Sequence, residues 1–305
     1  MPRYILGRVL LGVLTLFVLS VVIFALSRET GDPLLYVVGT EATPEQREQA
    51  RQDLGLDKPL PTQYLIWAGN AVQGDFGKAL VGRRPAADVV MERFPATVKL
   101  AVAAMLFAIP LGLMLGVLSA VYKDRLVDAV GRTVAILGQS LPSFWIGIML
   151  MLVFSVKLGL LPAAGMGGPK YFILPTVTVG MFLIAAITRL TRSSMVEVLA
   201  NDYIRTARAK GLPERLVIAR HALRNAAIPV LTLSAIMFAY ALTGSVVAET
   251  VFAWPGVGRL AFQSVTARDF PVVQVVVLLY GAIFIAINLL TDILYSWIDP
   301  RIRYG

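Results

Sequence analysis

The chain has 305 residues and is too apolar to fold as a soluble domain, since 57% of its residues are hydrophobic, only 15% are charged and the mean hydropathy is +0.73. A soluble domain of this length cannot bury so much apolar surface. The net charge of +9 does not indicate a nucleic-acid-binding protein, because no basic groove studded with aromatic residues accompanies it.

Six uncharged runs reach or approach the roughly 20 helical residues that cross a hydrocarbon core. Each run is continuously apolar and lacks the period-2 alternation of a barrel strand, so the runs predict helices. They comprise residues 9–27, 100–122, 133–156, 171–188, 225–248 and 270–291. The predicted fold is an all-α polytopic membrane protein with six transmembrane helices.

The first run also has features of a secretory signal, because Arg3 and Arg8 resemble a charged leader. At 19 residues, however, it is longer than a usual signal core, and residues 25–27 form no convincing cleavage site directly before Arg28. We expect a retained helix; the alternative is cleavage that leaves five spans.

Residues 28–94 separate the first two spans and predict a folded extracytoplasmic subdomain rather than a tail. A turn is predicted at Gly31-Asp32-Pro33. A helix is predicted over residues 43–54, where Thr43 and Pro44 form a typical helix start, and a second over residues 62–72.

The distribution of Lys and Arg predicts that both termini are cytoplasmic. With that orientation fifteen cations fall in inner segments and five in short outer ones, while residues 28–93 form a segment too long to count. The same bias, together with contact to anionic membrane lipid, accounts for the net positive charge.

Polar residues are sparse within the predicted spans. Gln139 and Ser140 precede Pro142 in the third span, Asn288 and Asp292 lie in the sixth, and Glu249 lies near the outer end of the fifth. Gln139, Ser140 and Asn288 are candidates for a transport pathway, although the stretch at Pro142 is equally consistent with a helix kink. For Asp292 and Glu249 the alternative is an ordinary hydrated or paired carboxylate near an interface.

Trp254-Pro255-Gly256 and the amphipathic stretch that follows predict a re-entrant or surface helix on the outer side. Its aromatic residue would suit the lipid headgroup level. Contact with an outer partner and simple anchoring are both open.

A basic segment at residues 202–229 interrupts this membrane-soluble chain. We expect the fourth span to continue as a helix past Arg189 and Arg192 toward Lys210. Gly211 then suits the left-handed position that ends a helix, and Pro213 suits the first turn of the next. A solvated loop needs neither a glycine at a fixed turn nor apolar residues such as Ile204 among the cations, so the segment predicts a packed docking surface.

Motifs for catalysis are absent. The chain has no cysteine and one histidine, His221, and no phosphate-binding loop, nucleophile elbow or metalloprotease signature occurs. We therefore expect no catalytic residue, no metal site and no cofactor in this chain.

The basic segment resembles the cytoplasmic motif of binding-protein-dependent ABC importer permeases. Gly211 and Ala207 occupy its glycine and second alanine, Arg205 and Thr206 replace its acid and first alanine, and His221 and Arg224 replace its isoleucine and proline. The dipeptide and oligopeptide branch is similar to this chain at strings along nearly its whole length: LGLDKPLPTQY, GDFGKAL, RFPATVKLA, SLPSFWIG, FSVKLGLLPA, DYIRTARAKGL, RHALRNA, ETVFAWPGVGRL, ARDFPVVQ and DPRIRY.

The resemblance implies a type I ABC importer permease fold with an extracytoplasmic helical insertion between helices 1 and 2. It implies residues 1–27 as the N-terminus and first helix, 28–94 as the insertion, 95–298 as the transmembrane domain and 299–305 as a cytoplasmic tail. A coupling segment at residues 197–224 would contact an ATPase through Tyr203, Arg205, Thr206, Ala207, Lys210 and Gly211.

The implied partners are a second permease subunit, two ATP-binding subunits that hold ATP and Mg²⁺, and an extracytoplasmic binding protein, all at the bacterial inner membrane. The implied function is ATP-driven import of peptides or a related small solute by alternating access. An ion-coupled secondary transporter without ATPase partners is the alternative, and a membrane-embedded enzyme ranks third because it lacks a catalytic constellation. The residues do not separate dipeptide, oligopeptide, glutathione, nickel-complex or opine substrates, and they leave the role of Glu249 open.

Overall fold

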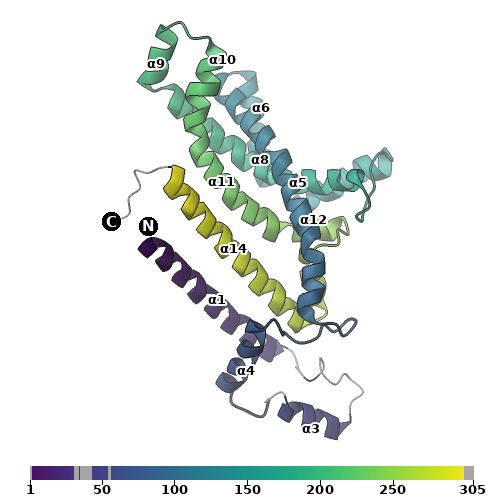
Figure 1. Ribbon diagram of the computed structural model, residues 1–305. Helices are drawn as coiled ribbons and strands as arrows, with labels where there is room; N and C mark the ends of the chain where they lie inside the picture. The colour runs from purple at the N-terminus through teal and green to yellow at the C-terminus, as the bar shows by residue number, and fades with distance from the viewer. Residues whose placement is uncertain (1, 31–33, 35–42, 54–55, 299–305) are drawn as a thin grey trace. The chain divides into compact units, whose positions relative to one another are not determined.

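The computed structural model describes residues 2–30, 34, 43–53 and 56–298, which are helical along most of their length (Figure 1). These residues contain no β-strand, only an isolated bridge between Lys78 and Pro85. The prediction of an all-α protein is confirmed. The helices form two compact units, one that includes Pro255–Leu289 with the helices before Ala96, and one built mainly from Thr97–Trp254. The predicted turn at residues 31–33 and the tail 299–305 lie outside the described residues.

Among the described residues five helices are long and apolar enough to cross a membrane, and the number is six if one bent helix pair forms a single span. The first three are α1 (Pro2–Thr30), α5 (Ala86–Val121) and α8 (Pro169–Leu199). The fourth, Glu214–Val251, joins α10 (Glu214–Leu216), the π-helix η2 (Val217–Ala222), α11 (Leu223–Gly244) and α12 (Val246–Val251), and the fifth is α14 (Phe270–Ile298). These helices are longer than the predicted runs, because hydropathy marks only the part of a helix that suits hydrocarbon.

The third predicted run is not one straight helix. It divides into α6 (Leu126–Ser140) and a second helix made of α7 (Ser143–Leu150) and the π-helix η1 (Met151–Lys157), with a bend of 105° between them. Leu141 has an extended backbone with ψ of 132°, as expected for a residue whose helical conformation clashes with a following proline ring. The prediction of a continuous helix over residues 133–156 was therefore wrong, and the kink at Pro142 is confirmed.

The described part of the segment between the first two spans contains two short helices. Helix α3 (Pro44–Asp53) begins with a reciprocal cap, in which the backbone N–H of Gln46 donates to the Thr43 hydroxyl and the backbone N–H of Thr43 donates to the Gln46 side chain. Helix α4 (Leu60–Val72) starts two residues earlier than predicted, with a proline in its first turn.

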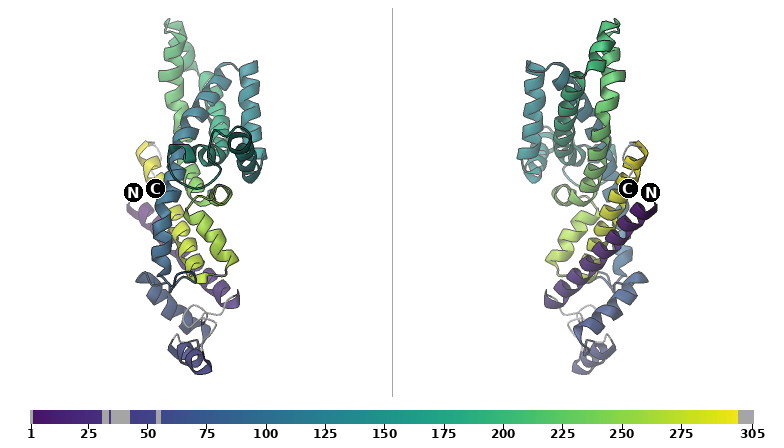
Figure 2. Two further views of the ribbon diagram at one scale, coloured as in Figure 1. Left: turned by 90° about the vertical axis from the view of Figure 1, so that its right-hand side faces the viewer. Right: turned by 90° about the vertical axis from the view of Figure 1, so that its left-hand side faces the viewer.

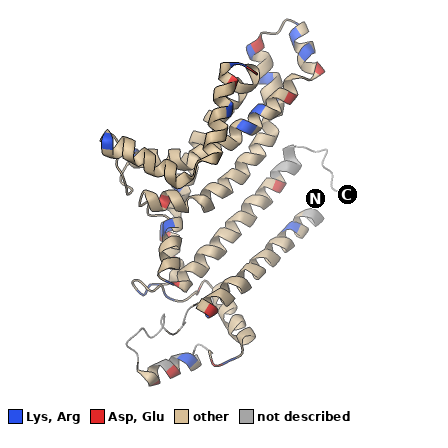
Figure 3. Ribbon diagram, turned by 180° about the vertical axis from the view of Figure 1, so that it is seen from behind, with Lys and Arg blue, Asp and Glu red and all other residues tan. Residues whose placement is uncertain are grey.

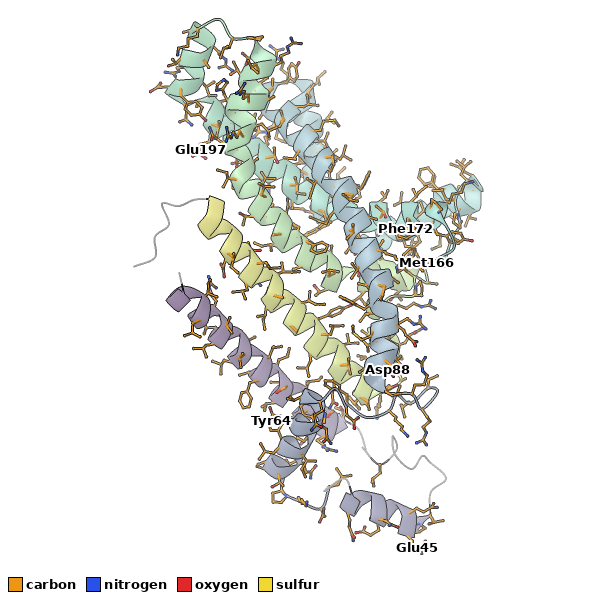
Figure 4. The ribbon with its side chains drawn as sticks, in the orientation of Figure 1. Glu45, Tyr64, Asp88, Met166, Phe172 and Glu197 are labelled. Carbon is orange, nitrogen blue, oxygen red and sulfur yellow. The ribbon has the colours of Figure 1, made fainter. Side chains whose placement is uncertain are left out.

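Aromatic and polar contacts hold α4 within its unit. Tyr64, labelled in Figure 4, and Trp67 both lie 5.5 Å from the Phe24 ring of α1. The Trp67 indole donates to the Gln274 side chain at 3.1 Å, and the Gln274 amide donates to the Ser27 hydroxyl at 2.9 Å. This chain of hydrogen bonds joins α4, α14 and α1.

Helix α8 is central to the other unit, where α6 and α11 lie beside it (Figures 1 and 2). Close approach to α5 requires Gly116, since a Cβ there would lie 2.5 Å from the Thr191 Cβ. Close approach to α6 requires Gly138, where a Cβ would lie 2.8 Å from the Ala185 Cβ. The half of α8 that leads to Glu197, labelled in Figure 4, is thus in close contact with α5 at Thr191 and with α6 at Ala185.

Candidate functional site

Helix α9 (Asp202–Ala209) lies at one end of its unit, where charged residues gather while the spans are mostly uncharged (Figure 3). Helix α8 ends at Leu199, and a turn at Ala200 and Asn201 redirects the chain before α9 begins. The prediction that α8 continues to Lys210 was wrong. Asn201 adopts an extended backbone with ψ of 150° but makes no side-chain cap hydrogen bond, so this break lacks the contact that usually marks the start of a helix.

One face of α9 is buried. Ile204 is fully buried and Ala207 is 6% exposed, and both join an apolar cluster that includes Met195 of α8 and Val217 of η2. The two buried positions are three residues apart, which places them on one face of a short helix. Burial of a large aliphatic side chain stabilises by about 1.5–3 kcal/mol, so Ile204 anchors α9 to the end of α8.

The opposite face of α9 is exposed and polar. It presents Tyr203, Arg205 and Thr206, with Lys210 and Gly211 following in the turn. The Arg205 guanidinium lies 3.3 Å from Asp202, and the Tyr203 hydroxyl accepts a hydrogen bond from the Asn225 amide at 2.8 Å. The structure therefore brings five of the six predicted contact residues to the surface, while Ala207 lies on the anchoring face.

Gly211 ends α9 in the left-handed conformation, with φ of +75°. Its N–H donates to the carbonyl of Arg208 at 2.9 Å, and the N–H of Leu212 donates to the carbonyl of Ala207 at 3.4 Å. This pair of bonds is a Schellman motif, which satisfies carbonyls that the helix end leaves unpaired. The predicted left-handed cap is confirmed.

A salt bridge that the sequence did not predict spans this turn. Arg208 donates from Nε to Glu214 at 3.1 Å and from a terminal nitrogen at 2.6 Å, so α9 and α10 are joined by a two-point contact. Both side chains are about half exposed. The sequence places opposite charges, Arg208 and Glu214, on either side of Gly211, but only the geometry of the turn shows that these side chains meet.

Asp128 forms a buried ionic contact between α6 and α8. Its fully buried carboxylate accepts hydrogen bonds from Arg192 at 2.6 and 2.8 Å, from the Ser119 hydroxyl at 2.5 Å and from the backbone N–H of Asp124 at 3.0 Å. Sequence reasoning missed this site, although an acid within an otherwise basic inner segment was a visible signal. The contact fixes α8 one turn before Met195, where α9 is anchored.

The candidate pathway residues do not form one group. Gln139 lines a cleft between α6, α8 and α11, whereas the neighbouring Ser140 is exposed and does not line it. Asn288 belongs to the other compact unit, and its amide donates to the carbonyl of Phe284 at 2.8 Å.

Glu249 and Trp254 are both fully buried. The Glu249 carboxylate accepts hydrogen bonds from Thr97 at 2.8 Å and from Ser245 at 2.9 Å, so it is a paired carboxylate and not a hydrated one. Trp254 packs edge-on against Phe172, with ring centroids 4.6 Å apart. Of the two open interpretations, simple anchoring at the headgroup level does not agree with this burial, and contact with an outer partner stays a prediction. The helix predicted after it is present as α13 (Val257–Thr266).

Comparison with known proteins places these features in a family. The model of the binding-protein-dependent transport system inner membrane component matches residues 94–304, and the N-terminal model of the same kind of membrane component matches residues 1–101. The glutathione transport system permease proteins GsiC of Escherichia coli K12 and of Shigella dysenteriae serotype 1 are each 45% identical over 305 residues, which cover all of both chains.

Two solved transporters share the fold. An amino acid ABC transporter crystallised with histidines aligns with a TM-score of 0.52 at 18% identity, over 70% of this chain and 94% of the other. The inward-facing MetNI methionine ABC transporter aligns with a TM-score of 0.55 at 17% identity, over 69% and 96%. Both likenesses cover most of the solved chain, so the helical fold is that of an ABC transporter permease.

Proposed function

The chain belongs to the family of binding-protein-dependent transport system inner membrane components and is a permease subunit of an ABC importer, and from this premise we propose that it carries glutathione or a similarly small peptide. Support for the solute comes from the 45% identity to glutathione permeases along the full length of both chains. The chain is a multi-pass inner membrane protein that works with ATPase and binding-protein subunits.

In the proposed complex, α9 transmits ATP-driven movement to the spans. The observation that carries this proposal is the division of α9 into a buried anchor at Ile204 and Ala207 and an exposed polar face. The polar face, with Tyr203, Arg205 and Thr206, would enter a cleft of the ATPase. Because this anchor packs α9 rigidly against α8, a movement of α9 would also move α8. A partner that drives a conformational change of the spans requires such a connection.

The proposed complex has two permeases, this chain and a homologous partner, with two ATPase subunits that hold ATP and Mg²⁺ and carry out hydrolysis. Both termini and α9 lie in the cytoplasm, and the segment that contains α3 and α4 lies outside, where a binding protein delivers the solute. The excess of Lys and Arg in the inner segments supports this orientation.

Reconstitution tests the transport proposal. The complete complex in liposomes is expected to take up labelled glutathione only with ATP inside and binding protein outside. Uptake driven by an ion gradient without ATP would contradict the mechanism, and ATP-driven uptake of other solutes but not of glutathione would contradict only the proposed solute.

Cysteine cross-linking tests the contact face, since the chain has no cysteine of its own. We expect Thr206→Cys to cross-link to a cysteine in the ATPase cleft. The matched control is Ile204→Cys, which lies two residues away but is buried and should not cross-link. If Thr206→Cys gives no cross-link in a complex that still transports, α9 does not present this face to the ATPase.

A further inference from the structure

A polar cleft lies in the unit that contains α8. It has a volume of about 500 Å³ and is formed by α6, α8 and α11. Its polar residues are Gln139, Arg189 and Ser193, and apolar walls come from residues such as Phe182 and Met237. This volume lies within the roughly 300–1,000 Å³ of small-molecule sites, and a few polar groups among apolar walls is the usual composition of such a site.

Arg189 and Arg192 lie one turn apart on α8 but differ in their contacts. The Arg192 guanidinium is neutralised by Asp128. Arg189 is exposed toward the cleft and makes no ion pair or side-chain hydrogen bond with the described residues. The positive charge of Arg189 in the cleft is therefore not compensated by an acid of the described residues. The ion pair that joins α8 to α6 is made by Arg192 and does not need Arg189.

Arg189 directly follows the uncharged run 171–188 of α8, and a charged side chain at the end of such a run is costly in hydrocarbon, so it faces water or another protein group. Arg189 lies ten residues before the end of α8, about 15 Å along the axis at 1.5 Å per residue. Gln139 and Ser193 share its surroundings, so three polar side chains lie together in this cleft. An anion that enters the cleft would be the missing partner of the guanidinium.

We propose that Arg189 binds the C-terminal carboxylate of the transported peptide as the peptide passes through the cleft, an inference that rests on the proposed function. A guanidinium matches a carboxylate with two parallel hydrogen bonds. Gln139 is placed to bind the peptide backbone through its amide.

The spacing of Phe182 and Arg189 along α8 fits a peptide of about three residues. Phe182, which stacks on Tyr240 with ring centroids 4.9 Å apart, lies seven residues before Arg189 on the same helix. Seven residues correspond to about 10 Å along the axis, and three extended residues span about 10 Å. A tripeptide whose carboxylate is held by Arg189 therefore reaches the aromatic pair with its other end.

The test compares uptake of labelled glutathione with uptake of the same tripeptide amidated at its glycine, in the complete reconstituted transporter. Both solutes are supplied at concentrations that load the binding protein equally, so that any difference arises in the permease. The variants are Arg189→Gln and Arg189→Lys. The matched control is Arg125→Gln, which removes an exposed arginine from the turn between α5 and α6 and does not line the cleft.

Arg189→Gln is expected to lower the uptake of free-acid glutathione about ten- to hundredfold and to leave the uptake of the amide unchanged. This fold-change corresponds to the loss of one charge-assisted hydrogen-bonded contact of about 1.5–3 kcal/mol. Arg189→Lys should retain most of the free-acid uptake, and Arg125→Gln should match the wild type. ATPase activity stimulated by the loaded binding protein should persist in all three variants.

An equal loss of both solutes in Arg189→Gln, or no loss of either, would overturn the proposal. An effect that varies with the anionic lipid content of the vesicles but not with the solute would also overturn it, because the guanidinium would then bind a lipid headgroup. If the wild-type complex transports neither solute, the proposed function fails first and this inference fails with it.

Discussion

The left-handed turn at Gly211 gives the sharpest test of the coupling segment. A Cβ at Gly211 would meet no atom of this chain within 4 Å. Within this chain the effect of a substitution therefore comes from the backbone, whose φ is +75°, and comparing two different side chains at this position controls for a clash with the ATPase. A left-handed conformation costs an ordinary residue about 1–2 kcal/mol, and β-branched residues are the least tolerant of it. Asparagine adopts this conformation much more readily and is found at the same helix-end position.

We therefore expect Gly211→Val and Gly211→Asn to differ, although both add a side chain of moderate size to the same open space. A penalty of about 2 kcal/mol shifts the equilibrium of the turn about thirtyfold toward conformations without the two hydrogen bonds that close it. Gly211→Val should reduce the number of solute molecules imported per ATP by at least about tenfold, on the same conversion of free energy to equilibrium. Gly211→Asn should stay within about twofold of the wild type.

The assay is paired measurement of ATP hydrolysis and solute uptake in proteoliposomes that contain the complete transporter, with hydrogen exchange of residues 208–213 as a structural readout. Faster exchange in the valine variant alone would locate its effect in the turn. If both variants import solute with the wild-type stoichiometry, or if both lose coupling equally, the left-handed turn is not what α9 needs to transmit movement.

Three further outcomes are expected. Asp128→Asn removes the charge that pairs with Arg192 in a buried site. It should lower the free energy of unfolding of the purified complex by about 3 kcal/mol, which is seen as a lower melting temperature. The control Arg132→Gln removes a half-exposed ion pair with an N–O distance of 3.5 Å and should cost less than about 1 kcal/mol. Ala207→Leu overfills the anchor of α9 and should weaken the association with the ATPase in pull-down assays without preventing membrane insertion. Burial raises the pKa of Asp269. Between the ordinary and the raised pKa the folded state therefore binds more protons than the unfolded state, and the melting temperature should fall as the pH rises through this range. Asp269→Asn should remove the part of this pH dependence that comes from Asp269.

The features that could be predicted from the sequence are those that depend on neighbouring residues. The cap at Gly211 followed from a glycine before Leu212 and Pro213. The kink at Pro142 was one of two open interpretations of residues 139–142, and its cause is the clash of the proline ring with a helical residue before it. Both are local backbone effects, so the residue type alone was informative.

The features that could not be predicted depend on where distant segments meet. Asp128 and Arg192 are 64 residues apart, and nothing in either local pattern identifies the partner. The break at Asn201 has neither a glycine nor a proline to mark it, and the burial of Trp254 depends on the packing of Phe172 against it. Hydropathy cannot separate an aromatic residue that faces lipid from one that faces protein, since both environments are apolar.

Three residues on α8 join the parts of the coupling proposal. Met195 packs in the cluster that anchors α9, Arg192 is fixed by Asp128, and Arg189 lines the polar cleft. They follow each other at intervals of three residues, so only about 9 Å of helix separates the α9 anchor from the cleft. Helices transmit displacement over such a length without bending appreciably unless a proline or π-bulge intervenes. The prolines of α8, Pro169 in its first turn and Pro175 inside the helix, both lie on the far side of Arg189. If the ATPase moves α9 as proposed, we expect α8 to carry Arg189 with it. A variant that weakens the contact between Arg192 and Asp128 should then uncouple ATP hydrolysis from transport before it unfolds the protein.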